Sequence, residues 1–137
     1  MQAAKAPTPE ARAAFDPHRL NAALAAGEPA RAVPALLQSE KDLPNDYNPP
    51  ARLAIVYREL GRFDDALAAS DRALARAYGP RRIRILEVKA SIFEKQHDPA
   101  GARAAIEQAL TIASSLPAAQ HGPVEAARLK QRLSQMH

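Results

Sequence analysis

The sequence contains no cysteine and no tryptophan, and it has only five glycines among 137 residues. Without cysteine the chain has no disulfide bond, no thiolate ligand for a metal and no cysteine nucleophile. The few glycines do not form the phosphate-binding loop, the dinucleotide-binding pattern or the serine elbow of common enzyme families. We therefore expect a protein that is not an enzyme and that carries no cofactor.

The spacing of a metal site is missing as well. The chain has four scattered histidines, and none has a partner four residues away, as a helical zinc site needs; they are His18, His97, His121 and His137. The neighbouring carboxylates Asp64 and Asp65 diverge on a helix and are suited to complement its dipole. We expect no metal site and no catalytic acid–base pair.

Long apolar runs are absent. No segment approaches the roughly 18 to 20 apolar residues that a membrane-spanning helix needs, and the first residues, MQAAKAPTPEARA, lack the apolar stretch of a secretory signal. We expect no membrane insertion. The sequence as given favours a soluble, cytoplasmic protein, with a periplasmic or exported location as the alternative if a leader has been removed.

Alanine, leucine and proline are abundant instead. Aromatic residues make up only 4% of the chain, so the composition favours an all-α fold. Six prolines stand where the first turn of a helix tolerates them. Starting from these prolines we predict seven helices, at 17–26, 29–40, 49–60, 63–77, 81–96, 99–115 and 123–136. We expect Pro34 to kink or delay the second of them.

Six positions of the stretch 54–73 recur with nearly constant spacing. They are Ala54, Tyr57, Gly61, Ala66, Ser70 and Ala73, which return 36 residues later as Ala90, Phe93, His97, Ala102, Ile106 and Ala109. A weaker copy precedes them by 34 residues as Leu20, Ala23, Gly27, Ala32, Leu36 and Ser39. In this pattern the sequence resembles the tetratricopeptide repeat family, whose unit is a helix-turn-helix of about 34 residues.

The resemblance implies an α-solenoid of three helical hairpins. We place the repeats at about 13–46, 47–80 and 83–116, a capping helix at 123–136 and a flexible tail at 1–12, so that 13–137 form one domain. Small residues such as Ala54 and Ala66 would allow the paired helices to approach closely, and Tyr57 and Phe93 would fill the space between hairpins. Four apolar residues of the capping helix are predicted to share its buried stripe: Val124, Ala127, Leu129 and Leu133.

The resemblance also implies a concave face, lined by the first helix of each hairpin, that binds a protein or peptide. Nine residues occupy the corresponding positions here: Asn21, Arg52, Ile55, Arg58, Glu59, Arg84, Glu87, Ser91 and Lys95. Because arginine dominates this set, and because the formal net charge of the chain is +4, we expect an acidic segment as the ligand. The groove is therefore predicted to serve a protein-interaction scaffold.

Two alternatives remain open. The basic run from Arg81 to Arg84 would attract nucleic acid, although the few aromatic side chains are assigned to the core and leave no stacking surface. An accessory protein of nucleic acid is therefore the less favoured interpretation. Self-assembly into a homo-oligomer through the exposed ends of the repeat array is the other.

Overall fold

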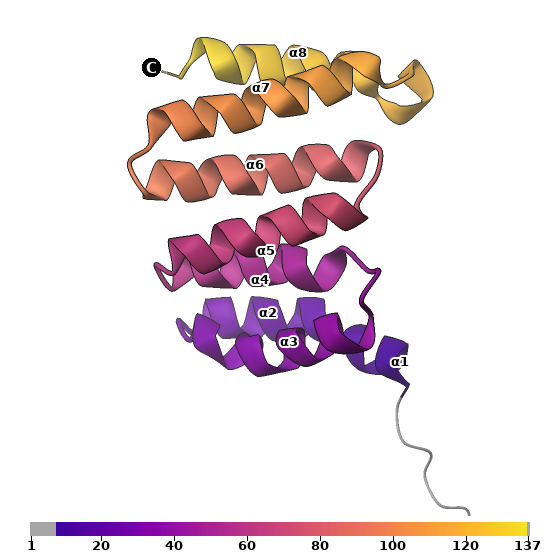
Figure 1. The fold of residues 1–137 in the computed structure, drawn as a ribbon, viewed down its shortest axis with the longest axis vertical. Coiled ribbons are helices and arrows are strands. Elements are labelled where there is room, and N and C mark those ends of the chain that lie inside the picture. The colour runs from indigo at the N-terminus through magenta and orange to yellow at the C-terminus, as the bar shows by residue number, and fades with distance from the viewer. Residues whose placement is uncertain (1–7, 137) are drawn as a thin grey trace, which may run out of the picture.

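The computed structural model describes residues 8–136, and within this range the chain is all-α (Figure 1). The α-helices are α1 (Pro9–Ala13), α2 (Asp16–Ala25), α3 (Val33–Asp42), α4 (Asn48–Glu59), α5 (Phe63–Arg76), α6 (Pro80–Lys95), α7 (Pro99–Ser115) and α8 (Gly122–Ser134). Two short 3₁₀ helices, η1 (Pro29–Ala32) and η2 (Ala118–Gln120), precede α3 and α8. The all-α prediction is confirmed.

The seven predicted helices correspond to α2 through α8, each within a few residues of its expected ends. Pro34 lies in the first turn of α3, which begins at Val33 after η1, so the expected late start is what the chain shows. Residues 1–7 of the predicted tail lie outside the described part of the chain. The short helix α1, which the sequence analysis did not predict, is capped by Thr8, whose side chain accepts from the backbone N–H of Ala11 at 3.0 Å.

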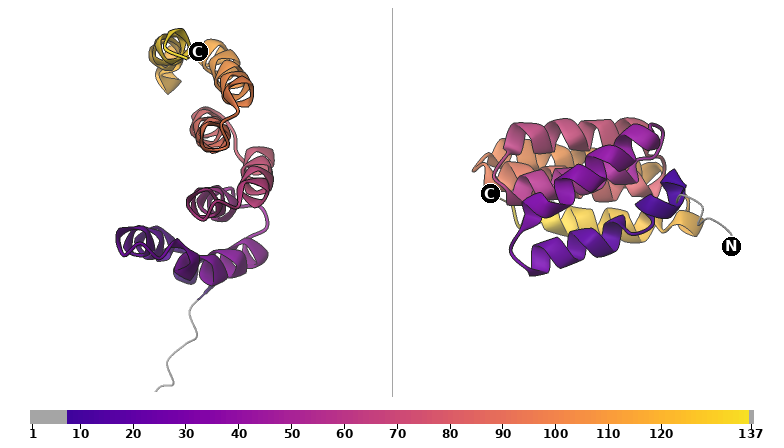
Figure 2. Two further views of the ribbon diagram at one scale, coloured as in Figure 1. Left: turned by 90° about the vertical axis from the view of Figure 1, so that its left-hand side faces the viewer. Right: turned by 90° about the horizontal axis from the view of Figure 1, so that it is seen from below.

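Consecutive helices form antiparallel pairs that stack into a curved array. The hairpins are α2 with η1 and α3, α4 with α5, and α6 with α7, and α8 packs on α7. Figure 2 shows α2, α4 and α6 on the inner side of the curve, with α8 at its far end, and α3, α5 and α7 on the outer side. The first helices of the hairpins therefore line one concave face.

The turn inside each hairpin has the same backbone conformation. Gly27, Gly61 and His97, which the repeat pattern aligns, have φ values of 70°, 74° and 60°. This left-handed conformation ends a helix readily at glycine and strains most residues that carry a Cβ. The third turn thus keeps the geometry of the repeat although histidine replaces glycine.

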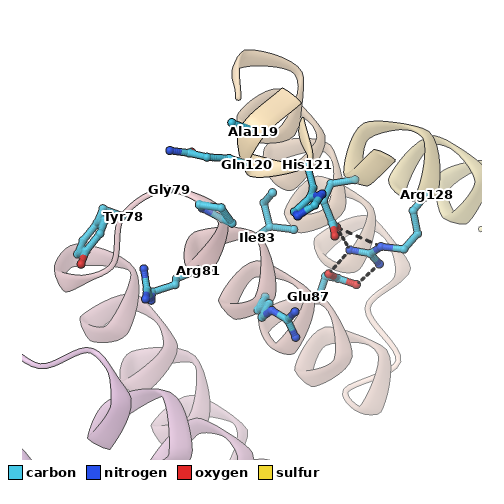
Figure 3. Close-up of a pocket in the computed structure, with 12 residues that line it drawn as sticks. Tyr78, Gly79, Arg81, Ile83, Glu87, Ala119, Gln120, His121 and Arg128 are labelled. Atoms are coloured by element: carbon cyan, nitrogen blue, oxygen red, sulfur yellow. Dashed lines mark hydrogen bonds and ion pairs between the residues drawn. The ribbon is translucent and has the colours of Figure 1, made fainter. Parts of the chain in front are cut away.

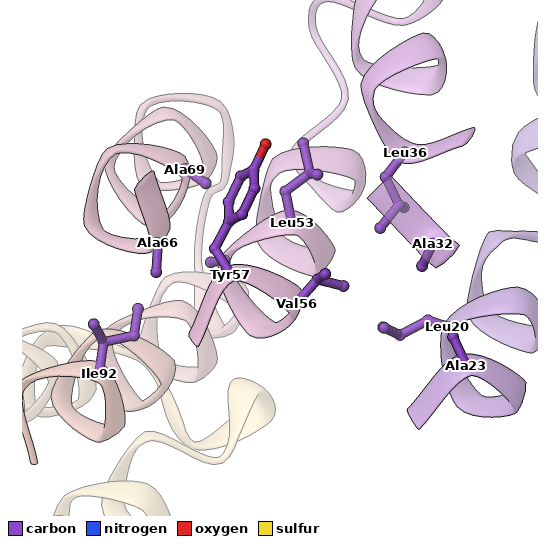
Figure 4. Packing of buried hydrophobic residues seen from close by; sticks show 11 residues of the cluster. Leu20, Ala23, Ala32, Leu36, Leu53, Val56, Tyr57, Ala66, Ala69 and Ile92 are labelled. Atoms are coloured by element: carbon purple, nitrogen blue, oxygen red, sulfur yellow. The ribbon is translucent and has the colours of Figure 1, made fainter. Parts of the chain in front are cut away.

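The predicted small residues lie at the helix crossings. Ala54, Ala66 and Ala73 are all fully buried. Tyr57 belongs to the same cluster as Ala54 and Ala66, and Figure 4 shows its ring beside α5, which carries Ala66 and Ala69. Ile92 of α6 belongs to the same buried cluster, although the rest of the α6 and α7 core forms a second cluster with Leu129 of α8. The core is therefore continuous from one hairpin to the next, as close helix packing requires.

The polar residues that precede three of the helix-starting prolines differ in how they bond to the backbone. Asp98 caps α7 by accepting from the backbone N–H of Gly101 at 3.0 Å, as its position predicts. Asp16 and Asn48 lie inside the first turns of α2 and α4, and neither makes a capping bond. At Asn48 the preceding Asp46 accepts from the backbone N–H instead, at 2.8 Å.

Candidate functional site

The concave face is the candidate site, because it gathers residues from three hairpins. Of the nine residues predicted to line it, Asn21 lies on α2, four lie on α4 and four on α6. These helices form the inner row of the array in Figure 2. Helical spacing places side chains three or four residues apart on one face, so Arg84, Glu87, Ser91 and Lys95 follow one another along α6.

Four of the predicted residues join α4 to α6 directly. The Arg58 guanidinium donates to the Ser91 hydroxyl oxygen at 2.8 Å, and the Ser91 hydroxyl donates to the carbonyl of Val88 at 2.6 Å. Glu59 accepts from Lys95 at 3.3 Å and pairs with the neighbouring Arg58. Burial alone would raise the pKa of Glu59, but the bonds from Arg58 and Lys95 outweigh it and lower that pKa.

The acidic residue of this set on α6, Glu87, is bound by α8. Its carboxylate accepts two bonds from Arg128, at 2.8 and 2.7 Å, and a third from Arg132 at 3.3 Å. Arg128 also pairs with Glu125 on its own helix, and Arg132 donates to Glu94 at 2.8 Å. The bond from Arg128 chiefly holds the pKa of Glu87 below its usual range, and Glu87 and Glu125 raise the pKa of Arg128.

These bonds correct the predicted orientation of α8. Val124 is 67% exposed and Ala127 is also exposed, while Ala126 and Leu129 are buried against α6 and α7. The helix is rotated so that its buried stripe runs through Ala126, Leu129 and the half-buried Leu133. In this rotation the arginines reach the glutamates of α6 rather than open water.

Two arginines of the predicted set keep unneutralised charges. Among the described residues, neither Arg52 nor Arg84 makes a side-chain hydrogen bond or an ion pair. Arg52 is half-buried and lines a small hollow with Pro17 and Asn48, and Arg84 is exposed. The remaining two members, Asn21 and Ile55, are exposed and half-buried respectively. Within the predicted set, four residues thus bond to one another, namely Arg58, Glu59, Ser91 and Lys95. Arg52 and Arg84 remain available to bind a ligand.

A hollow outside the predicted peptide groove lies beside Arg84. It is a cavity of about 690 Å³ between the start of α6, η2 and the start of α8 (Figure 3). Besides Arg84 and the Glu87–Arg128 pair, its lining includes Tyr78, Arg81, Gln120, His121 and Glu125. Sequence reasoning missed this site because its walls come from segments about 40 residues apart, which only the packing of α8 brings together.

The basic run does not form one patch. Arg81 lies over the rings of Tyr47 and Tyr78, with its guanidinium carbon 5.9 and 5.3 Å from their centroids. Arg82 borders a different hollow, with Leu74 and Leu86 as neighbours. Tyr78 is 69% exposed, so the expectation that the aromatic residues are committed to the core is wrong at this position. The run therefore divides its charges between opposite sides of α6.

The stacked hairpins agree with the comparison to known families. Residues 47–122, which are more than half of the chain and hold α4 to α7, match the tetratricopeptide repeat family. The chain belongs to this family. Tetratricopeptide repeat domains are generally protein–protein interaction modules and are typically not catalytic. No curated protein matches the sequence.

Residues 8–136 of this tetratricopeptide repeat protein contain neither a membrane-spanning helix nor a cluster of metal ligands. None of the helices in that range is long and apolar enough to span a bilayer. The same residues contain no group of three or more histidines and carboxylates arranged to hold a metal ion.

Proposed function

We propose that this tetratricopeptide repeat protein is a scaffold that binds an acidic segment of a partner protein along its concave face. The observation that carries the proposal is the charge state of the inner helices. Within the part of the chain that the structure describes, Arg52 on α4 and Arg84 on α6 have no carboxylate partner, whereas the acidic residues Glu59 and Glu87 are each bound by cations of the chain. An incoming carboxylate would therefore meet two available guanidinium groups, although Glu10 and Asp46 line the same hollow as Arg52.

The chemistry of arginine supports an extended acidic ligand. A guanidinium presents paired N–H donors that match the two oxygens of a carboxylate, and the pair gains strength where the groove limits access of water. Ile55 follows Arg52 by three residues on α4, is half-buried and offers an apolar contact. A peptide that crosses from α4 to α6 would thus make charged contacts with the arginines and an apolar contact with Ile55. The amide of Asn21 extends the same row to the first hairpin.

A peptide titration tests the proposal. The probe is a fluorescein-labelled peptide that alternates Glu with Ser, and the matched probe replaces each Glu by Gln. We expect the acidic probe to bind and the neutral probe to bind at least about ten-fold more weakly. The variant Arg52→Glu with Arg84→Glu should lose binding of the acidic probe by a similar factor, as measured by fluorescence anisotropy.

The control variant carries Lys41→Glu and Arg82→Glu. Both side chains are exposed and make no side-chain bond to another described residue, and Arg82 stands only two positions from Arg84 on the same helix. This variant has the same net charge as the groove variant but changes other surfaces, so it should bind within about two-fold of the natural sequence. If the groove variant and the control variant lost binding of the acidic probe equally, net charge rather than the position of the arginines would determine the binding. Tighter binding of a single-stranded oligonucleotide than of the acidic peptide would favour the nucleic-acid alternative.

A further inference from the structure

The cavity beside α6 is lined by several side chains that can donate hydrogen bonds. Arg81 and Arg84 reach it from α6, and Gln120 and His121 reach it from η2 and the turn that follows (Figure 3). Its volume of about 690 Å³ lies in the range of small-molecule sites. The donors come from different elements, so they do not share one plane.

Arg81 is positioned but not neutralised. Its guanidinium lies near the rings of Tyr47 and Tyr78, and no ion pair involves it within the described residues. Stacking on aromatic faces orients the plane of a guanidinium and leaves its N–H groups free at the edge. Arg84 follows one turn later on α6, and its side chain makes no bond to any residue of the range 8–136. The cavity thus has two guanidinium groups available for an anion.

The acidic residues of the lining do not cancel these charges. Glu87 and Glu125 both pair with Arg128, and Glu87 also pairs with Arg132. Figure 3 shows this cluster at the side of the cavity away from Tyr78 and Arg81. An anion that enters on the side of Arg81 therefore meets cations first and carboxylates that are already bound.

We propose that this cavity binds a tetrahedral oxyanion of the phosphate class, supplied either by a free phosphate monoester or by a phosphorylated side chain of a partner. Arg81 and Arg84 are its main ligands, and Gln120 and His121 are additional donors. A phosphate monoester has three terminal oxygens that point in different directions, so it can accept from several elements at once, whereas a carboxylate accepts mainly in one plane. The exposed ring of Tyr78 offers a surface for the organic part of the monoester.

This inference goes beyond the peptide groove, with which it shares Arg84 and the neutralised Glu87 but no other predicted groove residue. Arg52, on α4, does not line the cavity. Peptide binding that depends on Arg52 can therefore stand if the phosphate site fails, and the reverse also holds.

The first experiment compares phenyl phosphate with benzoate, which has the same ring and a planar carboxylate. Binding is followed by isothermal titration and by the NMR signals of the arginine Nε–H groups. We expect phenyl phosphate to bind at least about ten-fold tighter than benzoate and to shift the signals of Arg81 and Arg84. Equal binding of the two compounds would overturn the proposal.

Three substitutions locate the site. Arg81→Gln and Arg84→Gln should each weaken phenyl phosphate binding by about ten-fold, while Arg82→Gln, the matched control, should change it by less than about two-fold. Tyr78→Ala should weaken phenyl phosphate but not inorganic phosphate. Because all four side chains are exposed, these variants are expected to keep the fold, which circular dichroism checks. If Arg81→Gln and Arg84→Gln both bound phenyl phosphate as tightly as the natural sequence does, these two arginines would not be the ligands of the phosphate.

A second comparison distinguishes the two sources of the phosphate. A Ser-containing peptide is titrated in its phosphorylated form, in its unmodified form and with Glu in place of phosphoserine. A phosphopeptide that binds about ten-fold tighter than phenyl phosphate, with both other forms weaker, would identify a phosphorylated partner. A phosphopeptide no tighter than phenyl phosphate would identify a free monoester as the ligand.

Discussion

Glu87 of α6 and Arg128 of α8 form a two-fold hydrogen-bonded ion pair, with N···O distances of 2.8 and 2.7 Å. The two residues are 41 positions apart in the sequence. Arg132 adds a further bond to the same carboxylate. The capping helix is thereby attached to the concave side of the third hairpin by charge as well as by the burial of Leu129.

We predict that Glu87→Gln lowers the free energy of unfolding by about 1 kcal/mol at neutral pH, because a bidentate pair at a partly exposed site contributes roughly this much. The pKa of Glu87 is lowered in the folded state, chiefly by Arg128. Its contribution is therefore fully present above the usual glutamate pKa of about 4.3 and is lost as the pH falls through the lower folded-state value.

The measurement is urea unfolding of both proteins at neutral pH and near pH 2. The difference between the natural sequence and Glu87→Gln should shrink toward the acidic end, as Glu87 becomes protonated. A difference that stays constant across this range would show that the pair does not act through its charge.

The hairpin turns give a second prediction. Gly61 has a φ of 74°, and a Cβ added there meets no atom within 4 Å, so Gly61→Ala should be destabilising only through the backbone conformation. We expect a loss of about 1 kcal/mol. The control is His97→Ala in the equivalent turn, where a Cβ is already present at a φ of 60° and the loss should be much smaller. Equal losses in thermal unfolding would contradict this account.

The helix crossing of the second hairpin gives a third prediction. Ala66 is fully buried between α5 and its neighbours, and Ala66→Leu should overfill the crossing and destabilise the protein by about 1 to 3 kcal/mol. Ala68→Leu is the matched control, since Ala68 is exposed two residues later on the same helix. Chemical denaturation measures both. An unchanged midpoint for Ala66→Leu would mean that the crossing has room that the packing does not show.

The sequence predicted the local features of the fold because each has a local cause. Prolines indicated the helix starts through their missing N–H, and the turn positions Gly27, Gly61 and His97 followed from the repeat. The concave helices were predicted from the resemblance to the repeat family, in which the first helix of each stacked hairpin lines the inner face. The helix starts and the turns depend on residues within one repeat.

The contacts across the concave face were not predictable in the same way. Whether Arg58 meets Ser91, or Arg128 meets Glu87, depends on the rotation of two helices that are more than 30 residues apart. The apolar pattern of α8 was compatible with more than one rotation of the helix about its axis. The salt bridges to α6 form in the rotation that exposes Val124. The cavity followed from the same rotation, so its lining could not be listed beforehand.

The position of Ile92 affects how the molecule unfolds. This side chain is completely buried, and although it lies on α6 it belongs to the cluster formed by the two preceding hairpins. A fragment of the chain that ends before α6 would lack Ile92, and this loss would expose the apolar surface of α5 around Ala66 and Ala69. The third hairpin is thus part of the folding unit of the second, and we expect the two to melt together rather than one after the other.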